Sequence, residues 1–347
     1  MVGPIAASFL LCLLATFALR PVAFALNLVD RPGGRKIHEG EVPIVGGLAM
    51  LIGLVFGLGF VPLPLSDAAV APFMAACALL VTVGLIDDRF DLSPWLRLPV
   101  HCAAGVLLID AGVSIQTLGA PFGGDEIPLL GLDAYLVTML VVVASINAFN
   151  MLDGIDGLAG AMGIVTLSML AFLALDVGAV VLATTALTVV GAIAAFLVAN
   201  VPARFNREVR CFMGDSGSTL LGFTVAALGI AACQPPTRAA APVTLLWLAA
   251  LPLFDFSWTI IRRLLRKTSP LRPDDEHLHH LLVKAGFGVR GAFAIFVVLS
   301  SMLAGIGIVL DRSDVSDGIS LLLLVGTGIV VVRLMYMARA FRVRVSA

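Results

Sequence analysis

Charged residues are scarce in this chain: they make up 13% of its 347 residues, whereas 60% are hydrophobic and the mean hydropathy is +1.05. A typical soluble domain has about 25% charged residues, because water has to solvate its surface. The composition therefore excludes an ordinary soluble domain and predicts a protein embedded in a lipid bilayer.

Cysteine is scarce as well. The five cysteines are scattered along the chain, and no two of them form a CxxC pair. This spacing gives no sign of a thiolate metal site or a disulfide framework, so we expect small buried apolar residues at these positions. Basic residues are absent before Arg20. A cleaved signal peptide begins with basic residues, so we expect the first apolar run to be retained.

The apolar residues gather in runs of about the 17 to 25 residues that a bilayer-spanning helix needs. The expected fold class is therefore an all-α polytopic membrane protein with about eleven transmembrane helices. Because we find no internal repeat and no soluble segment, residues 1–347 are expected to form a single integral membrane domain. The expected spans are residues 2–28, 44–61, 70–86, 96–113, 134–151, 158–175, 178–199, 217–233, 242–261, 292–310 and 319–338.

Lysine and arginine lie almost entirely on one side of this arrangement. Eighteen of them follow odd-numbered spans or lie in the C-terminal tail, whereas only Arg238 and Arg312 follow even-numbered spans. Loops rich in Lys and Arg stay in the cytoplasm. We therefore expect the N-terminus outside and the C-terminus in the cytoplasm.

The stretches rich in Asp, Asn, His and Gly all fall on that same side. They are DRPGGRKIHEGEVPIVGG, DDRFDLSPWLRL, NAFNMLDGIDGLAG, NVPARFNREVRCFMGDSGS and RRLLRKTSPLRPDDEHLHHLLVKAGF. This common side predicts a functional site on the cytoplasmic face.

The IDDRFD stretch ends the third expected span with two adjacent acids, Asp87 and Asp88. If the helix continued, Asp87 and Asp91 would share a face, where like charges repel unless a cation lies between them. Hard oxygen ligands of this kind suit Mg²⁺. The alternative is a solvated helix end in which Arg89 pairs locally.

The NAFNMLDGIDG stretch ends another span. On a continuing helix Asn147, Asn150 and Asp153 would form one stripe, and Asp156 follows between glycines that let the backbone turn. A carboxylate at the centre of a bilayer costs about 2.5 to 3.5 kcal/mol, so such a cluster indicates function. A simple interhelical hydrogen-bond cluster is the alternative.

In FMGDSGSTLLGF, glycines flank Asp215, and small residues that include Ser218 open the eighth span. Free backbone N–H groups at a helix start favour an anion. An ordinary N-cap provided by Ser or Asp is the alternative.

The longest loop on this side combines clustered arginines, Arg263 among them, with His277, His279 and His280. Because the neighbouring motifs supply hard oxygen and no thiolate, phosphate recognition and proton handling fit these histidines better than transition-metal binding. The intramembrane Asp255 needs a partner, for which Arg262 or Arg263 is expected.

Clustered acids, amides, arginines and histidines at one membrane surface suit a reaction between polyanions, such as phosphoryl transfer. In order and spacing the five motifs resemble those of the polyprenyl-phosphate N-acetylhexosamine-1-phosphate transferases, over about residues 30–287. The resemblance is strongest to the bacterial branch that transfers GlcNAc-1-phosphate to undecaprenyl phosphate and starts O-antigen and common antigen synthesis.

The resemblance implies that UDP-GlcNAc and undecaprenyl phosphate give undecaprenyl-diphospho-GlcNAc and UMP, with Mg²⁺, or Mn²⁺ in its place. It implies a multi-pass enzyme of the bacterial inner membrane without a nucleic-acid partner, and it leaves a homodimer open. The implied catalytic residues are Asp87, Asp88, Asp156 and His279. The implied substrate-binding residues are Arg35, Lys36, His38, Asn147, Asn150, Asp153, Ser218, Arg263, His277 and His280. The implied metal ligands are Asp215, Asp87, Asp88 and Asn150.

Several alternatives stay open at this point. The donor sugar could instead be GalNAc, QuiNAc, FucNAc or phospho-MurNAc-pentapeptide, and transfer could be direct or proceed through an Asp-linked intermediate. A transporter of an anionic substrate is less well supported, because transporter sites lie at the bilayer midplane between repeated halves.

Overall fold

The computed structural model describes residues 1–347 except 32–39, 60–66, 202–210, 272–273, 275 and 347. Arg35, Lys36 and His38 therefore lie outside the described residues. The described part is helical apart from two short paired strands and the loops. Its elements are α1 Val2–Ala18, α2 Arg20–Leu26, β1 Val29–Asp30, β2 Val42–Pro43, α3 Gly46–Leu58, α4 Asp67–Phe90, α5 Pro94–Asp110, α6 Leu132–Leu152, α7 Leu158–Asp176, α8 Val180–Asn200, α9 Gly214–Cys233, α10 Pro242–Leu248, α11 Ala250–Leu265, α12 Leu278–Leu282, the π-helix η1 Val283–Phe287, α13 Gly288–Arg312 and α14 Asp317–Ser346.

Seven helices within the described residues are long and apolar enough to cross a membrane, and nine if each bent pair counts as one span. The bent pairs are α1 with α2, at 43°, and α10 with α11, at 86°. An all-helical polytopic membrane protein is thereby confirmed. The expected spans at 44–61 and 96–113 form α3 and α5. Helix α3, with 13 residues, is shorter than a span needs, and α5, with 17 residues, is at the lower limit. The count of eleven is therefore larger than the seven to nine that length and composition support.

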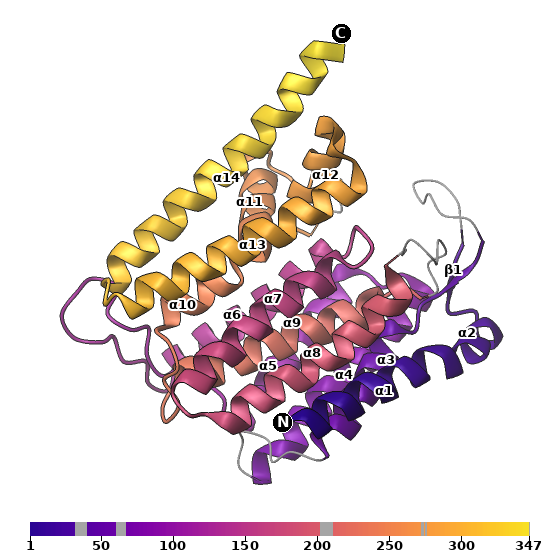
Figure 1. The fold of residues 1–347 in the computed structure, drawn as a ribbon, viewed down its shortest axis with the longest axis horizontal. Helices are drawn as coiled ribbons and strands as arrows, with labels where there is room; N and C mark the ends of the chain where they lie inside the picture. Colours follow the sequence, from indigo (N-terminus) through magenta and orange to yellow (C-terminus); the bar gives the residue numbers. More distant parts are fainter. Residues whose placement is uncertain (32–39, 60–66, 202–210, 272–273, 275, 347) are drawn as a thin grey trace.

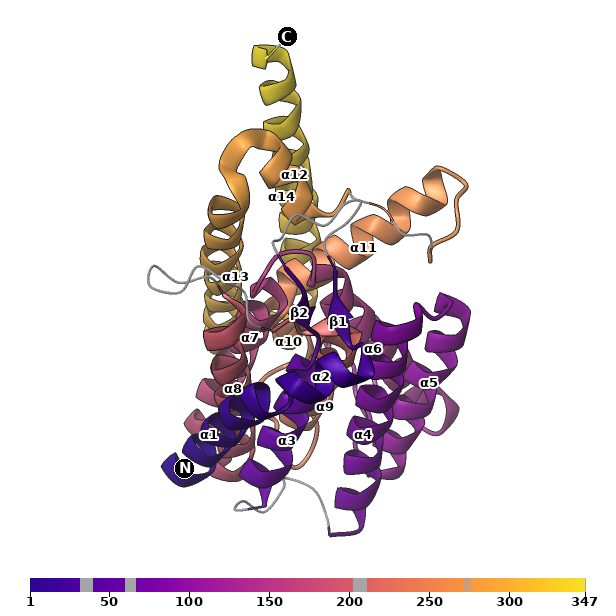
Figure 2. The same ribbon diagram turned by 90° about the vertical axis from the view of Figure 1, so that its right-hand side faces the viewer.

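The helices α1 and α3 to α9 form one bundle, and α13 and α14 lie beside it (Figure 1). The chain starts at one end of this bundle and α14 leaves it at the other end (Figure 2). Helix α9 runs through the centre, where it packs against α3, α4, α6 and α7. Its sequence is rich in Gly, Ala, Ser and Thr, and small residues let helices approach closely in a membrane.

Glycines bring three helices into contact at the first turn of α9. A Cβ atom at Gly84 of α4 would meet the backbone of Ser216, and one at Gly47 of α3 would meet the backbone of Ser216 and Gly217. The segment before α9 is held on the same side, because Phe212 N donates to Pro43 O at 2.9 Å and Gly46 N donates to Phe212 O at 3.0 Å. The start of α9 is thus fixed between α3 and α4.

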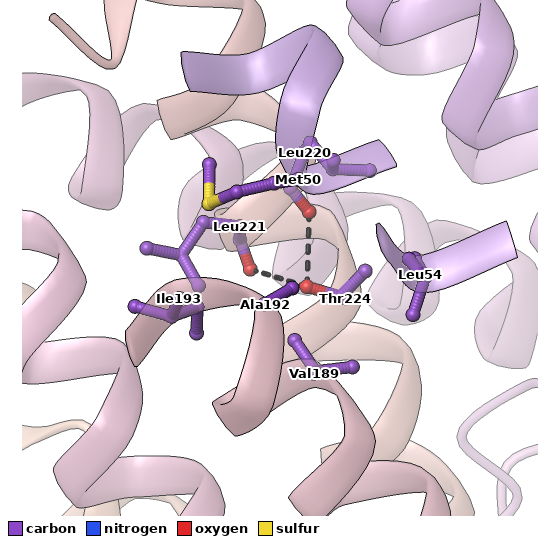
Figure 3. Close-up of a pocket in the computed structure, with 8 residues that line it drawn as sticks. All are labelled: Met50, Leu54, Val189, Ala192, Ile193, Leu220, Leu221 and Thr224. Atoms are coloured by element: carbon purple, nitrogen blue, oxygen red, sulfur yellow. Dashed lines mark hydrogen bonds between the residues drawn. The ribbon is translucent and has the colours of Figure 1, made fainter. Parts of the chain in front are cut away.

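The core between α3, α8 and α9 is closely packed. It leaves a cavity of ≈10 Å³ lined by apolar side chains and by Thr224, whose hydroxyl donates to the carbonyls of Leu220 and Leu221 (Figure 3). A space this small and apolar holds no ligand.

The sharp break between α10 and α11 follows from Pro252. Proline has no N–H to donate to the carbonyl four residues earlier, which is that of Leu248. That carbonyl instead accepts a hydrogen bond from Thr166 Oγ1 on α7, at 3.0 Å. The freed backbone group is therefore satisfied, and α11 leaves the direction of α10 and leans away from the bundle (Figure 2).

We predict that Gly84→Ala destabilises the protein by about 1 to 3 kcal/mol, because the added methyl group forces α4 away from the backbone of α9. The measurement is the free energy of unfolding in detergent. Gly326→Ala is the matched control, since a Cβ at that position of α14 meets no atom within 4 Å. Equal stability of the two variants would contradict the proposed close packing.

Candidate functional site

Asp88, near the end of α4, caps the first turn of α9. Its carboxylate accepts from the N–H of Asp215 at 2.7 Å and of Ser216 at 3.3 Å. Gly214 has φ +69°, and a Cβ there would meet the Asp88 carboxylate. The expected anion at this helix start is thus a carboxylate of another helix. The alternative, an N-cap provided by a Ser or Asp of the stretch itself, does not form. The positive end of the α9 dipole stabilises this carboxylate.

Asp87 and Asp215 share one cation, Arg97. Arg97 Nη1 donates to Asp87 Oδ2 at 2.8 Å and to Asp215 Oδ2 at 2.9 Å. Asp87 is buried and also accepts from Leu92 N at 2.6 Å. The side chains of Arg97 and Asp215 keep 27% and 32% of their surface exposed. Arg97 therefore joins a buried carboxylate to one that a ligand can reach.

Sequence reasoning missed Arg97, although a signal for it was present. Ser93 accepts from Trp95 N at 3.3 Å and Pro94 occupies the first helical position, so α5 begins just before Arg97. A cation in the first turn of a helix opposes the helix dipole. It is therefore expected where an acid lies nearby, and Asp87 and Asp88 end the preceding helix.

Asn150 brings α6 into the same group. Its side-chain nitrogen donates to Asp215 Oδ1 at 2.5 Å and to Ser218 Oγ at 3.0 Å. Asn147 lies one turn earlier and contacts the buried His101 at 3.3 Å. The aspartate cluster is defined here as Asp87, Asp88, Arg97, Asn150, Asp215 and Ser218. The structure thus brings four helices together at one end of the bundle.

Two stripes expected on continuing helices do not form. Helix α4 ends at Phe90, and Asp91 has φ +51°, so Asp87 and Asp91 do not share a helical face. Helix α6 ends at Leu152, so Asp153 follows the helix that carries Asn147 and Asn150. In both cases the helix ends one residue before the acid that would have completed the stripe.

Asp153 lies in the loop between α6 and α7, close to three further acids. The protein atoms crowded around it raise the pKa of Asp153 well above its ordinary value, and the carboxylates of Asp215, Asp88 and Asp156 raise it further. Its side chain nevertheless keeps an exposed surface. Negative charge is therefore in excess at this end of the bundle.

Asp255 pairs with His277 and not with the expected arginines. Asp255 is 1% exposed, its Oδ2 lies 2.9 Å from His277 Nδ1, and its Oδ1 accepts from Leu278 N at 2.8 Å. The expectation that Arg262 or Arg263 neutralises Asp255 is wrong. Those arginines lie two turns further along α11, where they reach the loop that folds back before α12.

Asp274 is the partner of both arginines. Arg262 Nη2 donates to it at 2.7 and 2.9 Å, and Arg263 Nε donates at 3.0 Å. Burial raises the pKa of Asp274, but hydrogen bonds from Arg263, Glu276 N and Arg262 outweigh burial and hold it well below its usual range. Arg263 is itself buried and donates to Pro270 O as well. The structure therefore places Arg263 in the support of this loop and not in the aspartate cluster.

His279 is fully buried, and neither of its ring nitrogens has a hydrogen-bond partner in the described part of the protein. Its ring is parallel to that of His277, at 5.7 Å, and 4.1 Å from that of His280. A Cβ at Gly154 would meet His279 Nε2, so the loop with Asp153 and Asp156 lies against the histidines. An unsatisfied buried polar group of this kind costs about 1 to 3 kcal/mol and suits a site that receives a ligand.

The described residues contain no group of three His, Cys, Asp or Glu side chains already placed to hold a metal ion. Mg²⁺ needs no such cage, because it keeps several waters and binds one or two carboxylates together with substrate phosphates. Asp87, Asp88 and Asp215 each accept a hydrogen bond on both carboxylate oxygens. The Asp215 side chain keeps 32% of its surface exposed, whereas that of Asp87 keeps 3%. The carboxylate of Asp215 and the neighbouring amide oxygen of Asn150 form a hard-oxygen set that fits Mg²⁺.

Comparison with known proteins gives a consistent result. Residues 70–233 match the model of glycosyl transferase family 4. The chain is 37% identical over 306 residues to the undecaprenyl-phosphate alpha-N-acetylglucosaminyl 1-phosphate transferase of Escherichia coli K12. This alignment covers 88% of this chain and 82% of that protein. The proteins of the same name from Salmonella typhi and Haemophilus influenzae are 37% and 35% identical, over 88% and 87% of this chain and 82% and 84% of theirs.

The matched family region runs from within α4 to the end of α9 and hence includes the whole aspartate cluster. The resemblance stated from the motifs is thereby confirmed over most of the chain. This membrane protein belongs to glycosyl transferase family 4, with the polyprenyl-phosphate N-acetylhexosamine-1-phosphate transferases.

Proposed function

We propose that the protein transfers GlcNAc-1-phosphate from UDP-GlcNAc to undecaprenyl phosphate, giving undecaprenyl-diphospho-GlcNAc and UMP, and so starts a lipid-linked surface glycan. The observation that carries the proposal is the aspartate cluster at one end of the membrane helices, where Arg97 joins Asp87 to Asp215. A water-soluble nucleotide sugar and a phosphate on a membrane lipid can meet only at such an end. The names of the relatives support the same reaction.

The site belongs on the cytoplasmic side of a bacterial inner membrane. The excess of Lys and Arg in the loops on the cluster's side supports this orientation. The two chain ends also lie at opposite ends of the bundle, with the C-terminus at the end where α4 finishes and α9 begins (Figure 2). In this orientation the aspartate cluster faces the cytoplasm, which is the compartment that supplies UDP-sugars.

Asp215 and Asn150 would hold Mg²⁺, or Mn²⁺, together with the diphosphate of the donor. The ion would neutralise charge on the phosphate oxygens, which the excess of carboxylates cannot do. Asp88 holds the first turn of α9 in place, and Asp87 holds Arg97. These two acids thus position the residues that meet the substrate.

Direct transfer needs little proton chemistry from the protein. A phosphate monoester has a second pKa of about 6, so the lipid phosphate is already ionised at neutral pH. One of its oxygens bonds to the phosphorus that carries the sugar, the bond from that phosphorus to the oxygen of UMP breaks, and UMP leaves with the electron pair. The carboxylates of Asp87 and Asp88 are engaged by Arg97 and by backbone N–H groups, which supports direct attack over an intermediate linked to either of these two acids.

The histidines would complete the donor site. His279 carries unpartnered ring nitrogens and lies against the loop that holds Asp153 and Asp156. A phosphate oxygen of the donor would accept from this ring, with His277 and His280 beside it. Phosphoryl transfer depends mainly on such positioning and charge neutralisation.

We predict that purified protein releases UMP only when UDP-GlcNAc, undecaprenyl phosphate and Mg²⁺ are all present, and that EDTA stops the release. Chromatography of UMP measures the reaction, and UDP-GalNAc, UDP-QuiNAc, UDP-FucNAc and UDP-MurNAc-pentapeptide are tested in parallel. Release with another donor alone would change the assigned sugar. A folded protein that releases no UMP from any of these donors would contradict the transferase.

We predict that Arg97→Gln lowers kcat at least about a hundredfold, because two carboxylates lose their shared cation where charge moves in the reaction. The measurement is steady-state UMP release by protein of normal elution volume. Arg89→Gln is the control from the same motif, since that side chain lies over the Phe90 ring, 5.2 Å from its centre. A similar loss in both variants would mean that Arg97 has no special role.

We predict that Asp255→Asn raises KM for UDP-GlcNAc about tenfold, since it removes a charge-assisted hydrogen bond that orients His277. The amide still accepts from Leu278 N, so the start of α12 is retained. Steady-state kinetics give KM and kcat separately, and Asp110→Asn at the exposed end of α5 is the control. A lower melting temperature with unchanged KM would show a purely structural role.

A further inference from the structure

A long groove lies between α14 and the bent pair of α10 and α11. Its volume is ≈990 Å³, and its walls run along α14 from Leu321 to Met337. At about 1.5 Å per residue this length is roughly 24 Å. Helix α14 is long and apolar enough to cross a membrane, and α10 and α11 pass the same test when the bent pair counts as one span, so the groove is open to occupants from the lipid bilayer. Figure 1 shows α14 passing beside α11, on the side of α10 and α11 where the bundle of α4 to α9 does not reach.

Two contacts hold the walls at a fixed separation. The ring of Phe254 on α11 rests on Gly328 of α14, where a Cβ would meet that ring. Nearer the far end, Trp258 Nε1 donates to the hydroxyl of Tyr336 at 3.1 Å, with the two rings edge to face. The groove is therefore part of the packed fold.

The groove has an apolar end and a polar end. Leu246, Leu253 and Leu321 line the part nearest α10, where both walls begin. Trp258, Arg333 and Tyr336 line the opposite part, at the end of the protein that holds the aspartate cluster. This gradient matches a molecule with a hydrocarbon chain and a polar headgroup.

Arg333 determines the sign of the charge that a bound headgroup would carry. Its side chain is exposed, and among the described residues no ion pair is formed with it. Arg333 is sixteen residues beyond Asp317, or about 24 Å along a helix that crosses roughly 30 Å of hydrocarbon. A long side chain at that depth reaches the headgroup region, where phosphate matches the guanidinium.

We propose that this groove binds an anionic phospholipid, with the headgroup phosphate on Arg333 and an acyl chain between α11 and α14. The lipid acceptor of the reaction is a different molecule. Its phosphate must reach the aspartate cluster on α4, α5, α6 and α9, and none of these helices contributes a residue to the groove. The charge of Arg333 and the apolar walls are the features that select the occupant.

The bound phospholipid supports the half of the molecule that carries the histidines. Tyr336, which lines the groove, accepts from Arg262 Nη1 at 3.1 Å, and Arg262 also holds Asp274 and Glu276 O in the loop before α12. Filling the groove fixes α11 against α14. It therefore steadies Asp255 and the loop that leads to His277.

The test measures the binding of phosphatidylglycerol, phosphatidylcholine and undecaprenyl phosphate to the delipidated full-length protein in detergent. Native mass spectrometry detects the bound lipid. We expect phosphatidylglycerol to bind at least about tenfold more tightly than phosphatidylcholine, and Arg333→Gln to remove this preference. Val325→Phe, which places a ring in the groove from an exposed position, weakens binding of both phospholipids.

Arg290→Gln is the matched control, an exposed arginine near the start of α13 that does not line the groove. It is expected to bind like the unchanged protein. Equal binding of the two phospholipids, or a preference that survives Arg333→Gln, would overturn the proposal. Displacement of phosphatidylglycerol by equimolar undecaprenyl phosphate, sensitive to Val325→Phe, would overturn it in favour of the acceptor.

Discussion

The contact between the Asp88 carboxylate and the first turn of α9 sets the positions of the other site residues. It joins the end of α4 to the start of the central helix, and it forms only because glycines let the two backbones approach. This contact also fixes the position of Asp215, because the N–H of Asp215 is one of the two groups that donate to the Asp88 carboxylate. Asn150, Ser218 and Arg97 are in turn placed around the Asp215 side chain.

Carboxylates near a hydrocarbon layer are costly, and the protein offsets this cost in two ways. Asp88 is stabilised by backbone N–H groups at a helix start, and Asp87 and Asp215 share the guanidinium of Arg97. Burial, together with the carboxylates of Asp215, Asp88 and Asp156, raises the pKa of Asp153, so negative charge is concentrated at this end of the bundle. Under the proposed function, a magnesium-bound diphosphate would neutralise this concentration of negative charge.

The break at Pro252 has effects on both sides of α11. On one side it aims Asp255 at His277 and so connects a membrane helix to the histidine-bearing segment. On the other side it opens the space along α14 that Arg333 and Tyr336 border. A single missing backbone N–H, whose partner carbonyl instead accepts from Thr166, thus affects both the histidine-bearing segment and the groove along α14.

The sequence by itself determined the membrane class, the helical fold, the family and the side on which the motifs gather, because hydropathy, loop charge and motif order are properties of short segments. It could not give the number of full spans, since α3 is shorter than its apolar run suggested and two other apolar runs form bent helix pairs. Only the tertiary structure decided which polar groups meet. Arg97 bridges residues 10 and 118 positions away, Asp255 meets a histidine and not an arginine, and Arg263 is committed to Asp274. Pairing of this kind depends on where helices end and how closely they pack, and no local pattern specifies either.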